Sequence, residues 1–128
     1  MSISEKKLAA ILALPGPERY SHFIKVVADR EKVWALYDNG WALMATDHGV
    51  EVFPAWPEQE YAVLFAVGEW QHYSPREIPI QSFLDELLPK LRESGTLLGV
   101  FPTSGHKAVT PSLDEVERDI RMELSRFE

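Results

Sequence analysis

The stretch from Val33 to Phe53 constrains the fold more than any other part of the chain. It holds three runs rich in aromatic and branched residues, separated by Asn39-Gly40 and by Asp47-His48-Gly49. Asn-Gly tolerates the positive φ angles of a type I′ turn, whose twist suits a tight antiparallel hairpin. Short apolar runs joined by such turns are typical of antiparallel strands. We therefore predict a three-stranded antiparallel meander, with strands at 33–37, 41–46 and 50–53.

Helical patterns flank the predicted meander on its N-terminal side. A short helix ends at Leu14, because Pro15 disfavours helical dihedrals in the residue before it. A second helix begins at Pro17, and its apolar residues recur at helical spacing. Charged residues, Arg19 among them, are expected to face away from that stripe. The apolar stripe consists of Tyr20, Phe23, Ile24 and Val27.

Pro54 and Pro57 are expected to stop the sheet, because neither proline donates a hydrogen bond to a ladder. Pro57 also suits the start of a helix, with Glu58 in a first turn where the helix dipole favours acids. The following segment, 61–67, is apolar on nearly every side and fits either a buried helix or a buried strand. We favour a helix through about Ala66.

The C-terminal half alternates further short strands with two helices. We predict a helix capped by Ser82 that stops at Gly95, with a kink or a split at Pro89. A second helix follows Ser112, which forms a capping box with Glu115. The predicted strands are an edge strand at 78–80, a strand at 96–101 and a weak partner at 107–109.

The whole pattern predicts one α+β domain spanning residues 1–128. Its mainly antiparallel sheet combines the three-stranded meander with the further short strands, and four to five helices pack against it.

Composition excludes several classes of function. The chain has no cysteine, which rules out disulfides, thiolate metal sites and cysteine nucleophiles. Its net charge of −7 disfavours nucleic acid as a partner, because phosphate backbones attract clustered Lys and Arg. No window is long and apolar enough to span a membrane, and the N-terminus does not match a secretory signal. We expect a soluble cytoplasmic protein; an acidic face that meets a basic partner is the sharper alternative.

No catalytic signature is present, and we predict no catalytic residue, cofactor or metal. His48, His72 and His106 lie in predicted loops, and convergence of the three on a metal is an alternative to simple exposure. Ser104-Gly105-His106 places a hydroxyl near an imidazole, but a nucleophile also needs an oriented base and an oxyanion hole. We interpret these three residues as a turn.

Three carboxylates belong to the predicted meander: Asp38, Asp47 and Glu51. They could face a cleft as an acid–base pair. The simpler interpretation is that the two aspartates hydrogen-bond backbone amides of their turns and that Glu51 faces solvent. An acid–base pair needs shifted pKa values, and turns rarely provide the burial that shifts them.

Four tryptophans are a high count for 128 residues. Most are expected in the core, as is usual in small domains. Trp56, held between Pro54 and Pro57, is the best single candidate for contact with a ligand or partner. The predicted binding surface comprises Trp56, Glu58, Tyr61, Asp38, Asp47 and Glu51.

Several motifs resemble a family of small bacterial proteins classed as domain of unknown function number 2750. The likeness runs over roughly Leu14 to Glu123; it implies a small bacterial cytoplasmic protein and supplies no activity. The second half has a looser likeness to SseB-type domains, which are linked to secretion systems rather than catalysis. The motifs that carry the main resemblance are Pro17-Glu18-Arg19-Tyr20-x-x-Phe23-Ile24, Val33-Trp34-x-Leu36, Gly40-Trp41 and Phe53-Pro54-x-Trp56-Pro57-x-x-x-Tyr61-Ala62.

Two hypotheses of different classes follow. The first is a non-catalytic protein-binding module, in its specific form an immunity protein whose acidic side chains block a basic toxin surface. The second is a small-molecule-binding or weakly catalytic domain with a pocket near Trp56 and Tyr61. A homodimer that buries the surplus aromatics is a further alternative.

Overall fold

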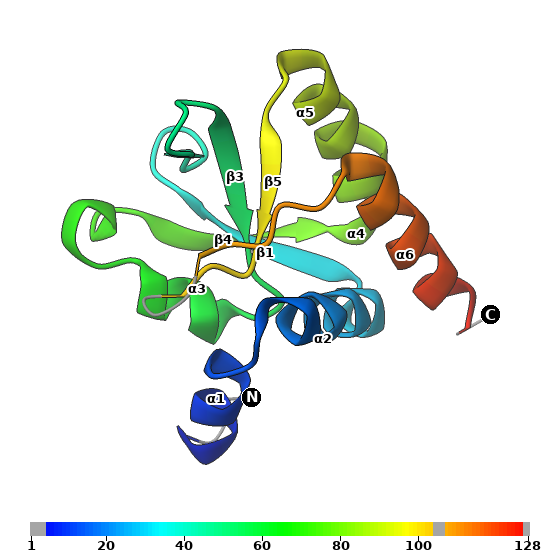
Figure 1. Ribbon diagram of the computed structural model, residues 1–128, viewed down its shortest axis with the longest axis horizontal. Helices are drawn as coiled ribbons and strands as arrows, with labels where there is room; N and C mark the ends of the chain where they lie inside the picture. Colours follow the sequence, from blue (N-terminus) through cyan, green and yellow to red (C-terminus); the bar gives the residue numbers. More distant parts are fainter. Residues whose placement is uncertain (1–4, 104–106, 127–128) are drawn as a thin grey trace.

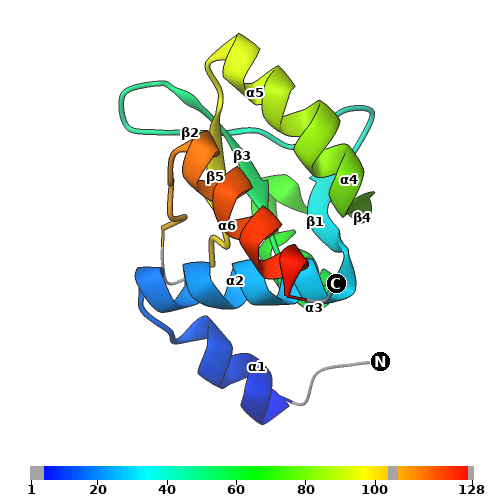
Figure 2. The same cartoon turned by 90° about the vertical axis from the view of Figure 1, so that its right-hand side faces the viewer.

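The computed structural model describes residues 5–103 and 107–126, and all structural statements below refer to these residues. Helices and strands combine in an α+β arrangement, as predicted (Figure 1). The strands meet at the centre of the molecule. In Figures 1 and 2, α1 lies below α2, on the side away from the strands.

The strands form two small sheets. In the first, β1 (Lys32–Tyr37) pairs antiparallel with β4 (Ser74–Pro79). In the second, the order is β2 (Met44–Ala45), β3 (Glu51–Ala55) and β5 (Leu97–Val100). The β2–β3 pair is antiparallel and the β3–β5 pair is parallel. The prediction of a mainly antiparallel sheet is therefore confirmed.

The two sheets are joined through two tryptophans. The backbone N–H of Trp34 in β1 donates to the carbonyl of Trp56 at 2.9 Å, and the reciprocal bond is 2.8 Å. This antiparallel bridge continues the edge of β3 just beyond its last residue. The strands consequently act as one bent layer rather than two independent sheets.

The predicted meander is confirmed in its second hairpin, where β2 pairs antiparallel with β3, and is wrong in its first, because β1 forms no ladder with β2. The turn itself is present: Asn39 has φ 57°, and the N–H of Ala42 donates to Leu36 O at 2.9 Å. The chain then leaves β1 after a single bridge between Tyr37 and Trp41. The ring centroid of Trp41 lies 5.1 Å from that of Tyr37 and 5.7 Å from that of Phe53. The ladder of β1 is made instead with the distant strand β4.

The strand β3 continues through Pro54, where the sequence predicts that the sheet stops. Trp56 directs its backbone toward β1, so Pro54, two residues earlier, directs its nitrogen to the same side. At Pro54 the short strand β2 has already ended and the Trp34 bridge has not yet begun. The missing N–H of the proline therefore falls where no partner strand would use it.

The predicted helices are present, with small shifts at their ends. The segment that fits either helix or strand is the helix α3, which confirms the preferred reading. None of the helices in the described ranges is long and apolar enough to cross a membrane. The bounds are α1 Glu5–Leu12, α2 Gly16–Arg30, α3 Gln59–Phe65, the 3₁₀ turn η1 Gly68–Trp70 and α6 Leu113–Ser125.

The helical segment around Pro89 is split into three parts, which confirms the predicted disruption. A short turn, α4 (Ile80–Ser82), leads into the π-helical η2 (Phe83–Leu87) and then into α5 (Leu88–Ser94). The wide π turn ends two residues before Pro89, which has no N–H for an i→i−4 bond. Ser82 is not the cap that the sequence predicts, because it has helical dihedrals and makes no cap hydrogen bond.

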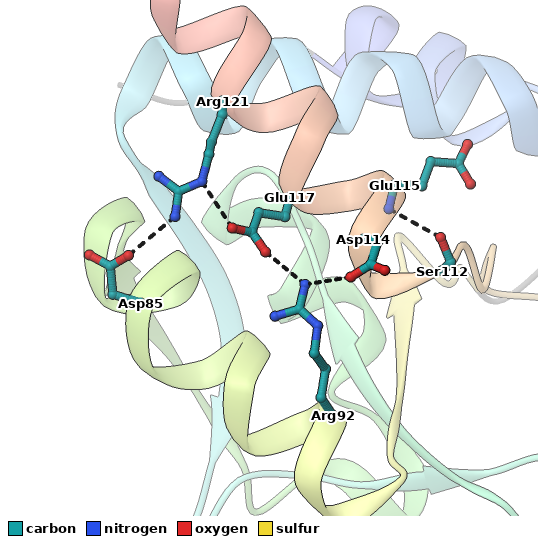
Figure 3. Close-up of polar contacts among 7 residues, drawn as sticks. All are labelled: Asp85, Arg92, Ser112, Asp114, Glu115, Glu117 and Arg121. Carbon is teal, nitrogen blue, oxygen red and sulfur yellow. Dashed lines mark hydrogen bonds and ion pairs between the residues drawn. The ribbon is translucent and has the colours of Figure 1, made fainter.

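The helix α6 packs across α2 and beside α5, as Figure 2 shows. The hydroxyl of Ser112 accepts from the N–H of Glu115 at 3.1 Å, so the predicted N-terminal cap is confirmed. Glu117 bridges Arg92 (2.7 Å) and Arg121 (3.0 Å), which ties α6 to α5 (Figure 3). These pairs lie at the surface, so their contribution to stability is small and screened by salt.

Candidate functional site

Trp56 and Tyr61 belong to the core and not to a binding surface. Trp56 is 0% exposed and Tyr61 is 2% exposed. The indole Nε1–H of Trp56 donates to Pro102 O at 2.9 Å, and its ring contacts that of Phe65 at 5.3 Å. Neither side chain reaches solvent, so direct contact with a partner through these two residues is excluded. The prediction that placed them on the binding surface is wrong.

The three carboxylates of the predicted meander are exposed. Asp47 pairs with Lys107, with 3.7 Å between Oδ2 and Nζ. The turn that carries Asp47 is held by Thr46, whose hydroxyl accepts from the N–H groups of His48 and Val50. Among the residues that the structure describes, no hydrogen bond or ion pair joins Asp38, Asp47 and Glu51 to one another.

Glu58 is half-buried at the start of α3. Burial raises its pKa, and the positive charge of Arg30 opposes this effect. Burial also raises the pKa of Tyr61 to about 12, helped by the charges of Glu58 and Glu60. The Tyr61 hydroxyl is buried and makes no hydrogen bond within the described part of the chain.

The histidines do not converge on a metal among the described residues. His48 and His72 are exposed, as predicted, and no group of three His, Asp or Glu side chains in 5–103 and 107–126 could hold an ion. His22 lies in α2 with its Nε2 atom buried; burial, and then two nearby lysines, lower its pKa. Ser104 and His106 lie outside the described residues.

A pocket of about 570 Å³ opens beside the predicted acids. One wall is the β2–β3 hairpin, and the opposite wall is the segment that follows β5. We call its apolar lining residues the floor: Met44, Ala45, Val52, Phe65, Pro102 and Ala108. We call its polar lining residues the rim: Thr46, Asp47, His48, Thr103, Lys107 and Thr110.

The hairpin wall is held by its own backbone and by close packing on β5. The N–H of Thr46 donates to Val50 O at 2.9 Å, which closes the turn between β2 and β3. Val52 packs over Gly99 so closely that a Cβ at that glycine would lie 2.5 Å from the Val52 Cγ1 atom. Glycine at position 99 therefore lets β3 and the pocket floor approach β5.

The opposite wall is anchored from the core. Phe101 adopts φ 55°, an uncommon conformation for a bulky residue, and this redirects the chain at the end of β5. Arg19, only 3% exposed, donates to the carbonyls of Leu14, Phe101 and Lys107. Together with the bond from Trp56 to Pro102, these contacts hold the wall from behind. The prediction that Arg19 faces solvent is wrong.

The family model of DUF2750, a protein of unknown function, matches residues 20–120. The chain belongs to this family. The match includes every residue that lines the pocket and all five strands of the DUF2750 fold. No curated protein and no solved structure matches the chain. The looser likeness to SseB-type domains stays a prediction.

Sequence reasoning missed most of the DUF2750 pocket. It singled out Asp47 but not Lys107, its partner across the mouth, because the two are far apart in the chain. For Arg19 a signal existed: it precedes Phe23 by four positions and thus shares the apolar face of α2. A single charged residue on an apolar helical face indicates either that the helical face is wrongly assigned or that the charged side chain is buried with hydrogen-bond partners. For Arg19 the second explanation holds.

Proposed function

We propose that this DUF2750 protein binds a small molecule in the pocket between the β2–β3 hairpin and the described residues that follow β5, at 102–103 and 107–110. The observation that supports the proposal is the pocket itself. Its volume of about 570 Å³ falls within the roughly 300–1,000 Å³ typical of ligand sites. An apolar floor under a few convergent polar groups is the usual lining of such sites.

The position of Trp56 also favours the pocket. Its indole is bonded to Pro102 and packed against Phe65, and both of these residues line the floor. Trp56, which the sequence singles out, therefore supports two residues of the pocket floor from the core side. Binding without chemistry is part of the proposal, and a ligand recovered unchanged by mass spectrometry is the expected result.

Thermal shift against a metabolite library, followed by ¹H–¹⁵N spectra of the four tryptophan indoles, tests this proposal. A ligand at 100 times its Kd should stabilise the protein by about 2.7 kcal/mol. It should also shift the Trp56 indole resonance, which a Trp56→Phe variant identifies. Ala45→Phe, which adds a bulky ring to the pocket lining, should abolish both effects.

Val50→Phe is the matched control, because Val50 lies on the same hairpin but does not line the pocket. It should leave binding intact. The proposal is overturned if no compound stabilises the protein, or if hits stabilise Ala45→Phe as much as the wild type.

A protein partner is a second candidate function, supported by exposed apolar residues on and after α3. Val63, Leu64 and Val67 are 50%, 48% and 61% exposed; we call these three residues the α3 apolar surface. Large exposed apolar side chains close together in the chain are typical of contact surfaces. The α3 apolar surface carries no acidic side chain among these three residues. It therefore favours a partner with an apolar groove over the basic toxin of the immunity hypothesis.

Light scattering at increasing protein concentrations tests the simplest such partner, a second copy of the chain. A Leu64→Ser/Val67→Ser variant should remain monomeric if the α3 apolar surface forms a homodimer. Co-expression with proteins encoded next to this one tests the immunity hypothesis. If the wild-type chain stays monomeric in light scattering and co-expression yields no stoichiometric partner, the protein-partner hypothesis is overturned and the pocket remains the candidate site.

A further inference from the structure

The mouth of the pocket carries one charge of each sign, on opposite walls. Asp47 comes from the β2–β3 turn and Lys107 from the segment after β5, and their charged atoms are 3.7 Å apart. Both side chains are about nine-tenths exposed, at 89% and 92%. A pair this exposed contributes only about 0–1 kcal/mol, so a ligand can replace it at little cost.

The groups around this pair can also hold a carboxylate. The Thr46 hydroxyl accepts two backbone hydrogen bonds, from His48 and Val50, and therefore keeps its own proton to donate. The imidazole of His48 stands on the same rim. Below these polar groups, the ring of Phe65 and the side chain of Val52 offer an apolar floor.

A ligand with a single charge fits this rim poorly. A carboxylate placed against Lys107 comes close to Asp47, and an ammonium placed against Asp47 comes close to Lys107. Like charges at such distances repel and cancel the gain from the favourable contact. A ligand that bears both charges on one carbon satisfies both side chains at once.

We infer that the pocket binds a small zwitterion with an apolar body, of the class of the free apolar α-amino acids. The carboxylate faces Lys107 and the Thr46 hydroxyl, the ammonium faces Asp47, and the side chain lies on the floor beside Phe65. This inference rests on the proposed function, because it names the ligand class of the same pocket.

Four probes that share a phenyl ring on a two-carbon chain separate the contributions of the two charges: L-phenylalanine, phenethylamine, 3-phenylpropanoate and the uncharged 2-phenylethanol. Their Kd values are measured by the shift of the Trp56 indole resonance and by calorimetry. L-phenylalanine should bind about three- to five-fold more tightly than either singly charged probe, the range expected for exposed charge pairs.

Two rim variants should then change the Kd values of different probes. Lys107→Met should weaken L-phenylalanine and 3-phenylpropanoate by about three- to five-fold and leave phenethylamine unchanged or improved. Asp47→Asn should weaken L-phenylalanine and phenethylamine and spare 3-phenylpropanoate. Both side chains are exposed, so neither change threatens folding. Lys90→Met, on an exposed lysine of α5 outside the pocket, is the matched control and should change no Kd.

The possible failures are distinguishable. If 2-phenylethanol binds as tightly as L-phenylalanine, or if the rim variants affect all probes alike, the zwitterion inference is overturned while the pocket keeps its proposed function. If none of the four probes binds, the inference is overturned as well. The proposed function falls only if the metabolite library also yields no ligand that Ala45→Phe excludes.

Discussion

Replacing Arg19 with methionine tests whether a buried cation holds the pocket wall. The guanidinium donates from Nε to Leu14 O at 3.0 Å, from Nη2 to Lys107 O at 3.2 Å, and from Nη1 to Phe101 O. Methionine keeps an unbranched apolar stem but provides no donor. The three carbonyls, which belong to segments far apart in the chain, then lose this common partner.

The cost of this change follows from the surroundings of each carbonyl. The Phe101 carbonyl is buried, and an unsatisfied buried acceptor costs about 1–3 kcal/mol. The carbonyls of Leu14 and Lys107 are only partly buried, so water can replace each lost bond at about 0.5–1.5 kcal/mol. The substitution also removes the free-energy cost of burying the Arg19 guanidinium, which offsets part of this loss of stability. We expect the free energy of unfolding to fall by about 2–4 kcal/mol.

Urea denaturation followed by tryptophan fluorescence measures this difference, provided that the m-value is unchanged. Arg118→Met, at an exposed arginine on α6, is the control and should stay within about 0.5 kcal/mol of the wild type. Arg19→Lys should fall between the two, because a single ammonium lacks the planar fork that reaches three carbonyls. An Arg19→Met variant as stable as the Arg118→Met control would refute the anchoring role.

Three further predictions concern other parts of the fold. Gly99→Ala should cost about 1–3 kcal/mol by overpacking against Val52, and in a double-mutant cycle Val52→Ala should recover part of that loss. Burial and two nearby lysines lower the pKa of His22, so its contribution is present above pH 6.5 and is lost as the pH falls below that value; His22→Gln should flatten the decline in urea stability on acidification. Glu117→Gln removes the carboxylate whose pKa two arginines lower by hydrogen bonding; the decrease in Tm should be small and should shrink further in about 1 M NaCl.

The candidate site could be predicted from the sequence only in part. The run around Trp56 lies next to the proposed site, because the Trp56 ring contacts Phe65 and its indole N–H donates to Pro102, both of which line the pocket. Sequence could not show that Trp56 faces inward and bonds to Pro102, since that contact joins segments separated by the whole of β4, α5 and β5. Nor could it show that Asp47 and Lys107 share one rim.

By itself, the sequence determined the elements whose causes are local. The apolar stripes of α2 and α6, the Ser112 cap, the turn at Asn39 and the helix stop at Gly95 all depend on residues within one or two turns of one another. These features could be predicted because short-range sterics and hydrogen bonds decide them.

Only the tertiary structure decided which distant segments meet. β1 presents apolar residues on both faces, so several strands would satisfy it, and the pairing of Val33 with Ile78 in β4 was settled by packing of the whole layer. The burial of Arg19 was decided in the same way, because a cation enters a core only where carbonyls from other segments are already in place to receive it. Local periodicity carries no information about such partners, and for that reason the pocket emerged only from the assembled fold.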